Sequence, residues 1–121
     1  MSIDPCDLLR RYHAAIDMID FAAIRSFFAQ DAIYRSAGTG PAEGRDTIMS
    51  AFERYFAEFP DQQAEDSLVE QVSPFSARAL WRLSATSTVT GRRSERQGEE
   101  IVTFDANGLI VSVEVRDLPK T

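Results

Sequence analysis

The sequence contains one cysteine and one histidine, which limits the chemistry available to it. Cys6 has no partner for an internal disulfide, and the flanking Asp4 and Asp7 make an acidic setting that disfavours a reactive thiolate. We therefore expect Cys6 to serve in helix packing. Since His13 falls in the same predicted helix, a zinc or iron site built from the usual ligands is not expected, and we assign no metal.

An excess of positive charge is also lacking. The chain has 13 Lys and Arg against 19 Asp and Glu, a net charge of −6 and a pI of about 4.7. Binding to nucleic acid needs a basic face that releases counterions, so we expect no nucleic-acid partner, and an anionic membrane surface is disfavoured for the same reason.

Long apolar runs are absent, and no stretch reaches the length of about 20 residues that a membrane-spanning helix needs. The first residues, Met1 to Pro5, have neither the positive region nor the apolar region of a secretion signal. The expectation is a cytoplasmic protein that makes no membrane contact.

Apolar and aromatic residues, by contrast, are plentiful enough for a core. The hydrophobic share is 44%, and the chain contains eight Phe, three Tyr and one Trp. A chain of 121 residues can bury a core without disulfides. With no repeats, low-complexity tracts or long linkers, we predict one domain over residues 1–121.

The first half of the chain carries helix signals. Asp4 with Pro5 predicts one helix start, and Asp20 predicts another. A third helix is predicted from about Arg45 to Phe59, before Pro60. Each segment repeats apolar residues at helical spacing: Leu8, Tyr12, Ala15, Ile16 and Ile19; then Phe21, Ile24, Phe27 and Phe28; then Ile48, Phe52, Tyr55, Phe56 and Phe59.

The second half carries strand signals, because from Asp61 onward the apolar period changes to two. Turns are marked by Gly91 and by Asp105 to Gly108, which ends in Asn-Gly. A short strand is also predicted within the first half, followed by a loop over Ala37 to Gly44. The predicted strands are Ala32–Ser36, Glu65–Ser73, Ala77–Val89, Ser94–Phe104 and Leu109–Asp117. This order indicates an α+β domain with the helices packed on one side of an antiparallel sheet.

Several segments give the chain a resemblance to a known superfamily. They are Arg11-Tyr12, the run from Asp20 to Phe28 leading into Asp31-Ala32, the stretch Gly44 to Ile48, and the stretch Phe104 to Ser112. The chain resembles the nuclear transport factor 2-like superfamily, which includes ketosteroid isomerase and the SnoaL-like polyketide cyclases. The resemblance implies a cone-shaped curved sheet enclosing a pocket, and often a homodimer formed sheet to sheet.

The resemblance to ketosteroid isomerase implies a set of site positions. Its oxyanion tyrosine falls on Tyr12 and its neutral carboxylic acid on Glu100. Its general base falls on Ser36, whose hydroxyl cannot act as a base without an activating group. Steroid-type isomerisation by the same mechanism is therefore not expected. Asp117 is a candidate for the missing base, and the other interpretation is that Asp117 is simply solvated.

Strand alternation predicts which other side chains share the pocket. If Glu100 points inward, so do Val102 and Phe104, while Glu99 and Ile101 point outward. The family register adds Tyr34, Ser36, Trp81, Leu83, Val113 and Val115 to the wall. Such a cavity is mostly apolar with a few polar atoms, which is typical of a site for a small hydrophobic ligand.

Other interpretations of these residues stay open. Glu100 could instead be a rim residue paired with Arg82 or Arg96, and Tyr12 could be a core aromatic. A helix turns His13 about 100° away from Tyr12, so we expect His13 at the surface or in helix packing.

The arginines that follow the turn at Gly91 have two interpretations. Arg92, Arg93 and Arg96 cluster there and could clamp a carboxylate or phosphate. A solvated hairpin tip is the expectation.

The leading hypothesis is a cofactor-free enzyme of the isomerase or cyclase type, acting by proton transfer on a small hydrophobic carbonyl compound. Glu100 would be the acid or base, and Tyr12 the oxyanion donor. The alternative is a non-catalytic, dimeric ligand-binding or association domain that has lost its catalytic base.

Overall fold

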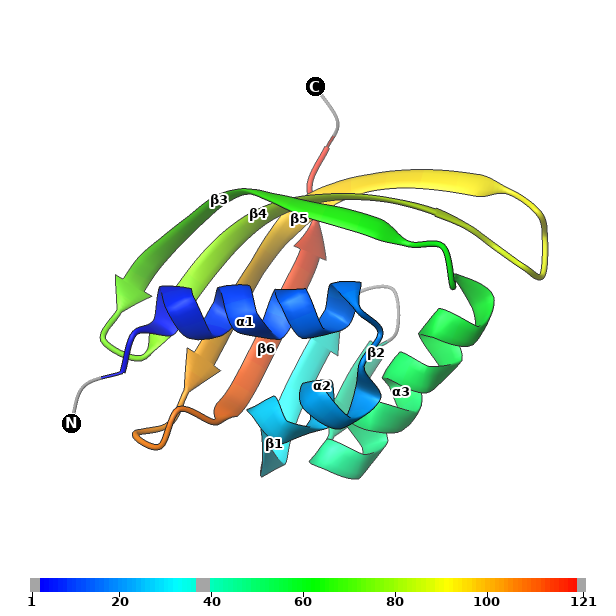
Figure 1. Ribbon diagram of the computed structural model, residues 1–121. Helices are drawn as coiled ribbons and strands as arrows, with labels where there is room; N and C mark the ends of the chain where they lie inside the picture. The colour runs from blue at the N-terminus through cyan, green and yellow to red at the C-terminus, as the bar shows by residue number, and fades with distance from the viewer. Residues whose placement is uncertain (1–2, 37–39, 120–121) are drawn as a thin grey trace.

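The computed structural model describes residues 3–36 and 40–119, which form three helices and one six-stranded sheet (Figure 1). In chain order the elements are α1 (Pro5–Asp17), α2 (Phe21–Phe27), β1 (Phe28–Ser36), β2 (Gly40–Glu43), α3 (Arg45–Glu58), β3 (Gln63–Ser73), β4 (Ser76–Thr86), β5 (Arg93–Phe104) and β6 (Ile110–Asp117). Among the described residues, no helix combines the length and the apolar character needed to cross a bilayer.

The strands lie in the order β2-β1-β6-β5-β4-β3. Every neighbouring pair is antiparallel except β1 and β6, which run parallel, so the sheet is mixed and not antiparallel throughout as predicted. The sheet curves, and the helices lie on its concave side, with α1 crossing the sheet and α3 at one end (Figure 1). The predicted α+β class, with its curved sheet and three helices, is confirmed.

The helix starts follow the predicted capping chemistry. The Asp7 N–H donates to Asp4 Oδ1 at 3.1 Å, and the Ala23 N–H donates to Asp20 Oδ1 at 3.1 Å. Each carboxylate thus satisfies an N–H group that has no partner within its own helix. Because the capping signals are local, they could be read from the sequence.

The segment between the first strand and the third helix differs from the prediction. Within the loop expected over Ala37–Gly44, residues Gly40–Glu43 form β2, which pairs with β1 and places Tyr34 opposite Ala42. Residues 37–39 lie outside the described part of the chain. The strand before them also begins earlier than predicted, at Phe28, because the backbone there pairs with Ile110 of β6. The fully buried Phe28 side chain contacts Tyr12 of α1.

The core fills the closed part of the concave side, where side chains from α1, α2 and the inner face of the sheet meet. The largest fully buried side chains include Leu9, Tyr12, Ile24, Phe28 and Ile110. Val102, Phe104 and Val113 point inward as predicted but lie in this core rather than at the pocket wall.

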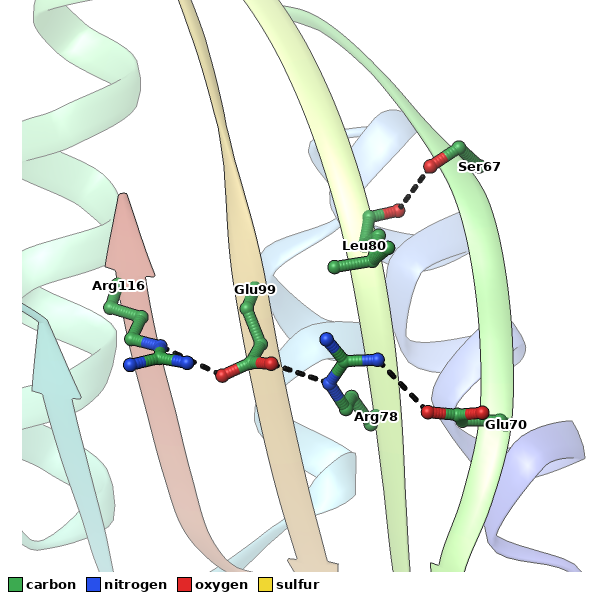
Figure 2. Close-up of polar contacts among 6 residues, drawn as sticks. All are labelled: Ser67, Glu70, Arg78, Leu80, Glu99 and Arg116. Carbon is green, nitrogen blue, oxygen red and sulfur yellow. Dashed lines mark hydrogen bonds and ion pairs between the residues drawn. The ribbon is translucent and has the colours of Figure 1, made fainter. Parts of the chain in front are cut away.

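The outer face of the sheet carries an ion-pair chain that crosses four strands (Figure 2). The Arg78 Nη1 donates to Glu70 Oε1 at 2.9 Å, and Arg78 Nε donates to Glu99 Oε2. The Arg116 Nε donates to Glu99 Oε1 at 2.8 Å. We call Glu70, Arg78, Glu99 and Arg116 the outer network. The sheet-to-sheet homodimer that the resemblance implies would use this face, and it stays a prediction.

Candidate functional site

A cavity of about 550 Å³ lies between α1, α3 and the inner face of the sheet. Its volume is that of a site for a small molecule. Most of its wall is apolar, and much of that wall comes from α3 and the residue that follows it: Ile48, Ala51, Phe52, Tyr55, Phe56 and Phe59. The apolar stripe predicted for the third helix therefore forms one side of the pocket.

Three ionisable side chains meet at the wall of this cavity, each from a different element. They are His13 on α1, Asp66 on β3 and Glu100 on β5, and we call them the inner cluster. The His13 Nδ1 lies 2.7 Å from Asp66 Oδ2, and the His13 Nε2 hydrogen bonds to Glu100 Oε1. Because carboxylates only accept hydrogen bonds, both ring nitrogens donate, and the ring is an imidazolium.

The charge balance agrees with that protonation state. Burial on its own lowers the pKa of His13, but the Glu100 charge and the hydrogen bonds to Asp66 and Glu100 outweigh burial and raise the pKa from 6.5 to about 10. The Glu100 side chain is only 7% exposed, so its charge is stabilised mainly by protein groups and little by water. Burial of a carboxylate normally requires a partner of opposite charge, and His13 supplies one.

The sheet explains why a histidine is needed to join these carboxylates. Asp66 and Glu100 lie on β3 and β5, which are separated by β4. Neighbouring strands are about 4.8 Å apart, so the two backbones lie roughly 10 Å from one another. On β4, Ala79 lies opposite Glu100 and its side chain is small and fully buried. A ring that donates from both ends spans this gap.

The position of His13 corrects the expectation of a surface or helix-packing role. The residue lies on the pocket wall because α1 crosses the sheet and presents a broad face to it. The signal was present in the sequence: Leu9, Tyr12, His13 and Ile16 follow the spacing i, i+3, i+4, i+7, which places His13 on the apolar face.

Tyr12, the predicted oxyanion donor, lies in the core and not at the cavity wall. Its side chain is fully buried among aromatic rings, with the Phe28 ring centroid 5.5 Å away in an edge arrangement. Its hydroxyl has no hydrogen-bond partner among the described residues, and Tyr12 is not part of the cavity wall. Burial, followed by the nearby Tyr34 and Glu100, raises the pKa of Tyr12, which keeps the hydroxyl protonated in the core.

Tyr34 on β1, unlike Tyr12, lies at the cavity wall. It lines the cavity, and within residues 3–36 and 40–119 no hydrogen-bond partner is found for its hydroxyl. Burial raises the pKa of Tyr34 strongly, and Glu100 adds to the effect. The side chain is therefore a neutral donor facing the pocket. Ser36, Trp81, Leu83 and Val115 also line the cavity, as predicted.

The proposed substitute base, Asp117, is not at the pocket wall. Its side chain is 53% exposed and accepts two hydrogen bonds from Arg96, from Nε at 3.1 Å and from Nη2 at 2.7 Å. The pocket residue of this pair is Arg96, whose guanidinium carbon lies 5.6 Å from the centroid of the Trp81 ring. Arg96 is thus not part of a solvated hairpin tip.

The geometry of the inner cluster does not suit a metal ion. Its two carboxylates lie on opposite sides of the imidazole, so their oxygens do not converge on one point. In the described part of the chain, no group of three or more His, Cys, Asp or Glu side chains is arranged to hold an ion.

Comparisons with known proteins agree with the fold. Residues 9–113 match a family model described as a SnoaL-like domain. Among solved structures, the epoxide hydrolase/cyclase-like enzyme SalBIII is 17% identical with a TM-score of 0.82, over 93% of this chain and 88% of that one. SalBIII has a role in pyran ring formation in the polyether salinomycin.

Two further solved structures are similar. A putative polyketide cyclase from Xanthomonas campestris is 16% identical with a TM-score of 0.76, over 91% of this chain and 87% of that chain. A ketosteroid isomerase-like protein from Erwinia carotovora atroseptica is 18% identical with a TM-score of 0.72, over 94% and 93%. Among curated proteins, no match is found.

Proposed function

Because the chain belongs to the SnoaL-like domain family, we propose that it is a cofactor-free enzyme of the isomerase or cyclase type, which moves a proton on a small, largely apolar carbonyl compound. The observation that carries the proposal is the Glu100 carboxylate, which is nearly buried, lines an apolar cavity and is hydrogen bonded to His13. The similar solved structures, a cyclase-like enzyme and a ketosteroid isomerase-like protein among them, support the same reaction class.

In this proposal Glu100 is the base. His13 stays protonated at neutral pH and donates to one carboxylate oxygen, Oε1. The other oxygen, Oε2, has no hydrogen-bond partner among the described residues, so it is available to accept a proton from the substrate. Asp66 holds the far side of the imidazolium and fixes the ring against both carboxylates. A fixed orientation of the base reduces the reorganisation that the reaction needs.

Tyr34 is the proposed donor to the carbonyl oxygen. Loss of a proton from the carbon next to a carbonyl leaves negative charge on the oxygen, and a neutral hydroxyl that donates to this oxygen stabilises that charge. Tyr34 meets this requirement because it lines the cavity and its raised pKa keeps it protonated. Tyr12, which the sequence suggested for this role, is enclosed in the core.

The proton balance allows either outcome of the reaction. Glu100 takes the proton and an enolate forms, with its oxygen hydrogen bonded to Tyr34. In an isomerisation the protonated Glu100 returns the proton to a different carbon of the substrate. In a cyclisation the enolate carbon forms a bond to a second carbonyl carbon of the same molecule, the π bond of that carbonyl breaks, and the proton passes from Glu100 to the resulting alkoxide oxygen.

Hydrogen–deuterium exchange tests the first step without knowledge of the natural substrate. Butyrophenone, an apolar phenyl ketone, is incubated with the protein in deuterium oxide, and loss of the proton signal next to the carbonyl is followed by NMR. We expect the wild type to accelerate exchange, and Glu100→Gln to slow the accelerated rate by about 100-fold or more, as for loss of a positioned base.

Glu99→Gln is the matched control, since it makes the same change one residue away on the opposite face. We expect it to leave the rate within about threefold of wild type, because Glu99 does not line the cavity. Exchange no faster than in buffer, or equal losses in the two variants, would contradict the proposal and favour the non-catalytic ligand-binding alternative.

A further inference from the structure

Two arginines line the cavity without a part in the proposed proton transfer, namely Arg54, whose side chain is exposed, and Arg96. Arg96 lies on the same strand and the same face as Glu100, with Gly98 between them. At a strand rise of about 3.3 Å per residue, their Cα atoms are roughly 13 Å apart. The cavity therefore has a carboxylate base toward one end of this strand and a guanidinium toward the other.

Neighbouring side chains hold the Arg96 guanidinium in place. Asp117 accepts from Nε and Nη2, and the guanidinium lies over the face of Trp81. Gly98 on β5 lies between Trp81 on β4 and Asp117 on β6. Its lack of a side chain leaves room for the Trp81 ring, because a Cβ added at Gly98 would come within 2.3 Å of that ring. Of the five N–H donors of the guanidinium, Asp117 takes two, and Nη1 has no partner among the described residues.

The outer network shows that one guanidinium of this sheet serves two carboxylates. Arg78 binds Glu70 through Nη1 and Glu99 through Nε at the same time (Figure 2). Arg96 presents the same kind of fork on the inner face, but among the described residues only the carboxylate of Asp117 binds it. A second carboxylate would have to come from the molecule in the cavity.

We propose that the substrate is a keto acid, whose carboxylate binds Arg96 while its ketone lies against Tyr34 and Glu100. This inference rests on the proposed function and names the class of molecule on which it acts. The apolar wall from α3 takes the hydrocarbon between the two polar groups. Arg96 is thus a specificity-determining residue, since it distinguishes an acid from the neutral ketone of the same shape.

The test compares β-benzoylpropionate with its methyl ester, which keeps the ketone and removes the charge. Binding of each to the full chain is measured by calorimetry. We expect the wild type to bind the acid at least about tenfold more tightly than the ester, as for one charge-assisted hydrogen-bonded pair. Arg96→Gln should remove this preference and leave ester binding within about threefold.

Two further variants keep the test decisive should Arg96→Gln fold poorly. Asp117→Asn removes the carboxylate that competes for Arg96, and we expect the preference for the acid to rise by at least about threefold. Arg93→Gln changes an arginine on the same strand that does not line the cavity, so the preference should stay at its wild-type value. Equal affinity of the wild type for acid and ester, or a preference that survives in Arg96→Gln, would overturn the inference.

The exchange reaction separates this inference from the proposed function. If the ester undergoes Glu100-dependent exchange but the acid is not preferred, the keto-acid inference fails and the enzyme proposal stands. If the acid is preferred through Arg96 but neither compound undergoes Glu100-dependent exchange, the proton-transfer proposal fails and the cavity is a binding site for carboxylates.

Discussion

Two adjacent glutamates on β5 point their side chains to opposite faces of the sheet. Glu99 faces outward and Glu100 faces inward, and both are nearly buried, at 8% and 5% exposed. Glu99 is held by two arginines, Arg78 and Arg116, which occupy both of its carboxylate oxygens. Glu100 is held by one histidine, which occupies one oxygen.

The difference separates a structural carboxylate from a reactive one. Arginine keeps its proton at any pH that the fold survives, so the charge around Glu99 is fixed. Histidine exchanges its proton in the range where proteins work, and a neighbouring carboxylate moves that range upward. The outer network therefore stabilises the sheet, whereas the inner cluster has a free oxygen and a titratable partner beside a cavity.

The largest difference that we predict between the two faces is in the pH dependence of stability. His13 has a folded-state pKa of about 10 against 6.5 in the unfolded chain, so its stabilising effect is complete below pH 6.5 and is lost as the pH rises toward 10. Across that window the free energy of unfolding should fall by about 1.4 kcal/mol per pH unit. Urea denaturation between about pH 7 and pH 9.5 measures this slope, an expected total of roughly 3 kcal/mol.

The variant His13→Asn should be less stable at pH 7 and should show most of this slope removed, because asparagine does not titrate. Glu99→Gln should keep the slope, since the pKa of Glu99 is lowered by Arg78 and lies far below that window. A wild-type slope that persists in His13→Asn would mean that another group causes it, and the imidazolium assignment would be wrong.

The next largest effect concerns two tyrosines of the inner side, the buried Tyr12 and the partly buried Tyr34. Tyr34→Phe removes a donor that faces the cavity, so it should slow exchange of butyrophenone by about 10- to 100-fold, the worth of one hydrogen bond to a charged oxygen. Tyr12→Phe removes a hydroxyl that has no partner among the described residues, so the rate should change by less than about twofold. If the two effects were reversed, Tyr12 would be the oxyanion donor after all.

These residues show how far the sequence could predict the site. The resemblance to ketosteroid isomerase placed Glu100 at the site, and strand alternation then placed Glu99 on the opposite face. Capping by Asp4 and Asp20 located two helices, because such signals depend only on neighbouring residues. The family register that the resemblance implied named Tyr34, Ser36, Trp81, Leu83 and Val115, which line the cavity, and Val113, which lies in the core instead.

What the sequence could not supply depends on distances between elements. The role of His13 follows from how α1 crosses the sheet and brings it between two strands that are not neighbours. The depth of Tyr12 against Tyr34 depends on where the core ends and the cavity begins. Likewise β2 forms only because β1 offers it an edge, and its few residues carry no strand pattern of their own.

The smallest effect that we predict isolates the structural role of the outer face. Glu99→Gln removes the charge that joins Arg78 to Arg116, and we expect a loss of about 1 kcal/mol in the free energy of unfolding, because both arginines keep contact with water. The depressed pKa of Glu99, caused first by its hydrogen bond from Arg78, means that this contribution is present above the ordinary pKa of a glutamate and is lost as the pH falls through the folded-state pKa. Stability lost through Glu99 therefore appears in acid, at the opposite end of the pH scale from that of His13.

Glu114→Gln, which weakens the exposed pair with Arg35 on the same face, is the control and should change stability by no more than about 0.5 kcal/mol. Equal effects of Glu99→Gln and Glu114→Gln in urea denaturation would show that burial of Glu99 beneath the two arginines adds nothing to the sheet.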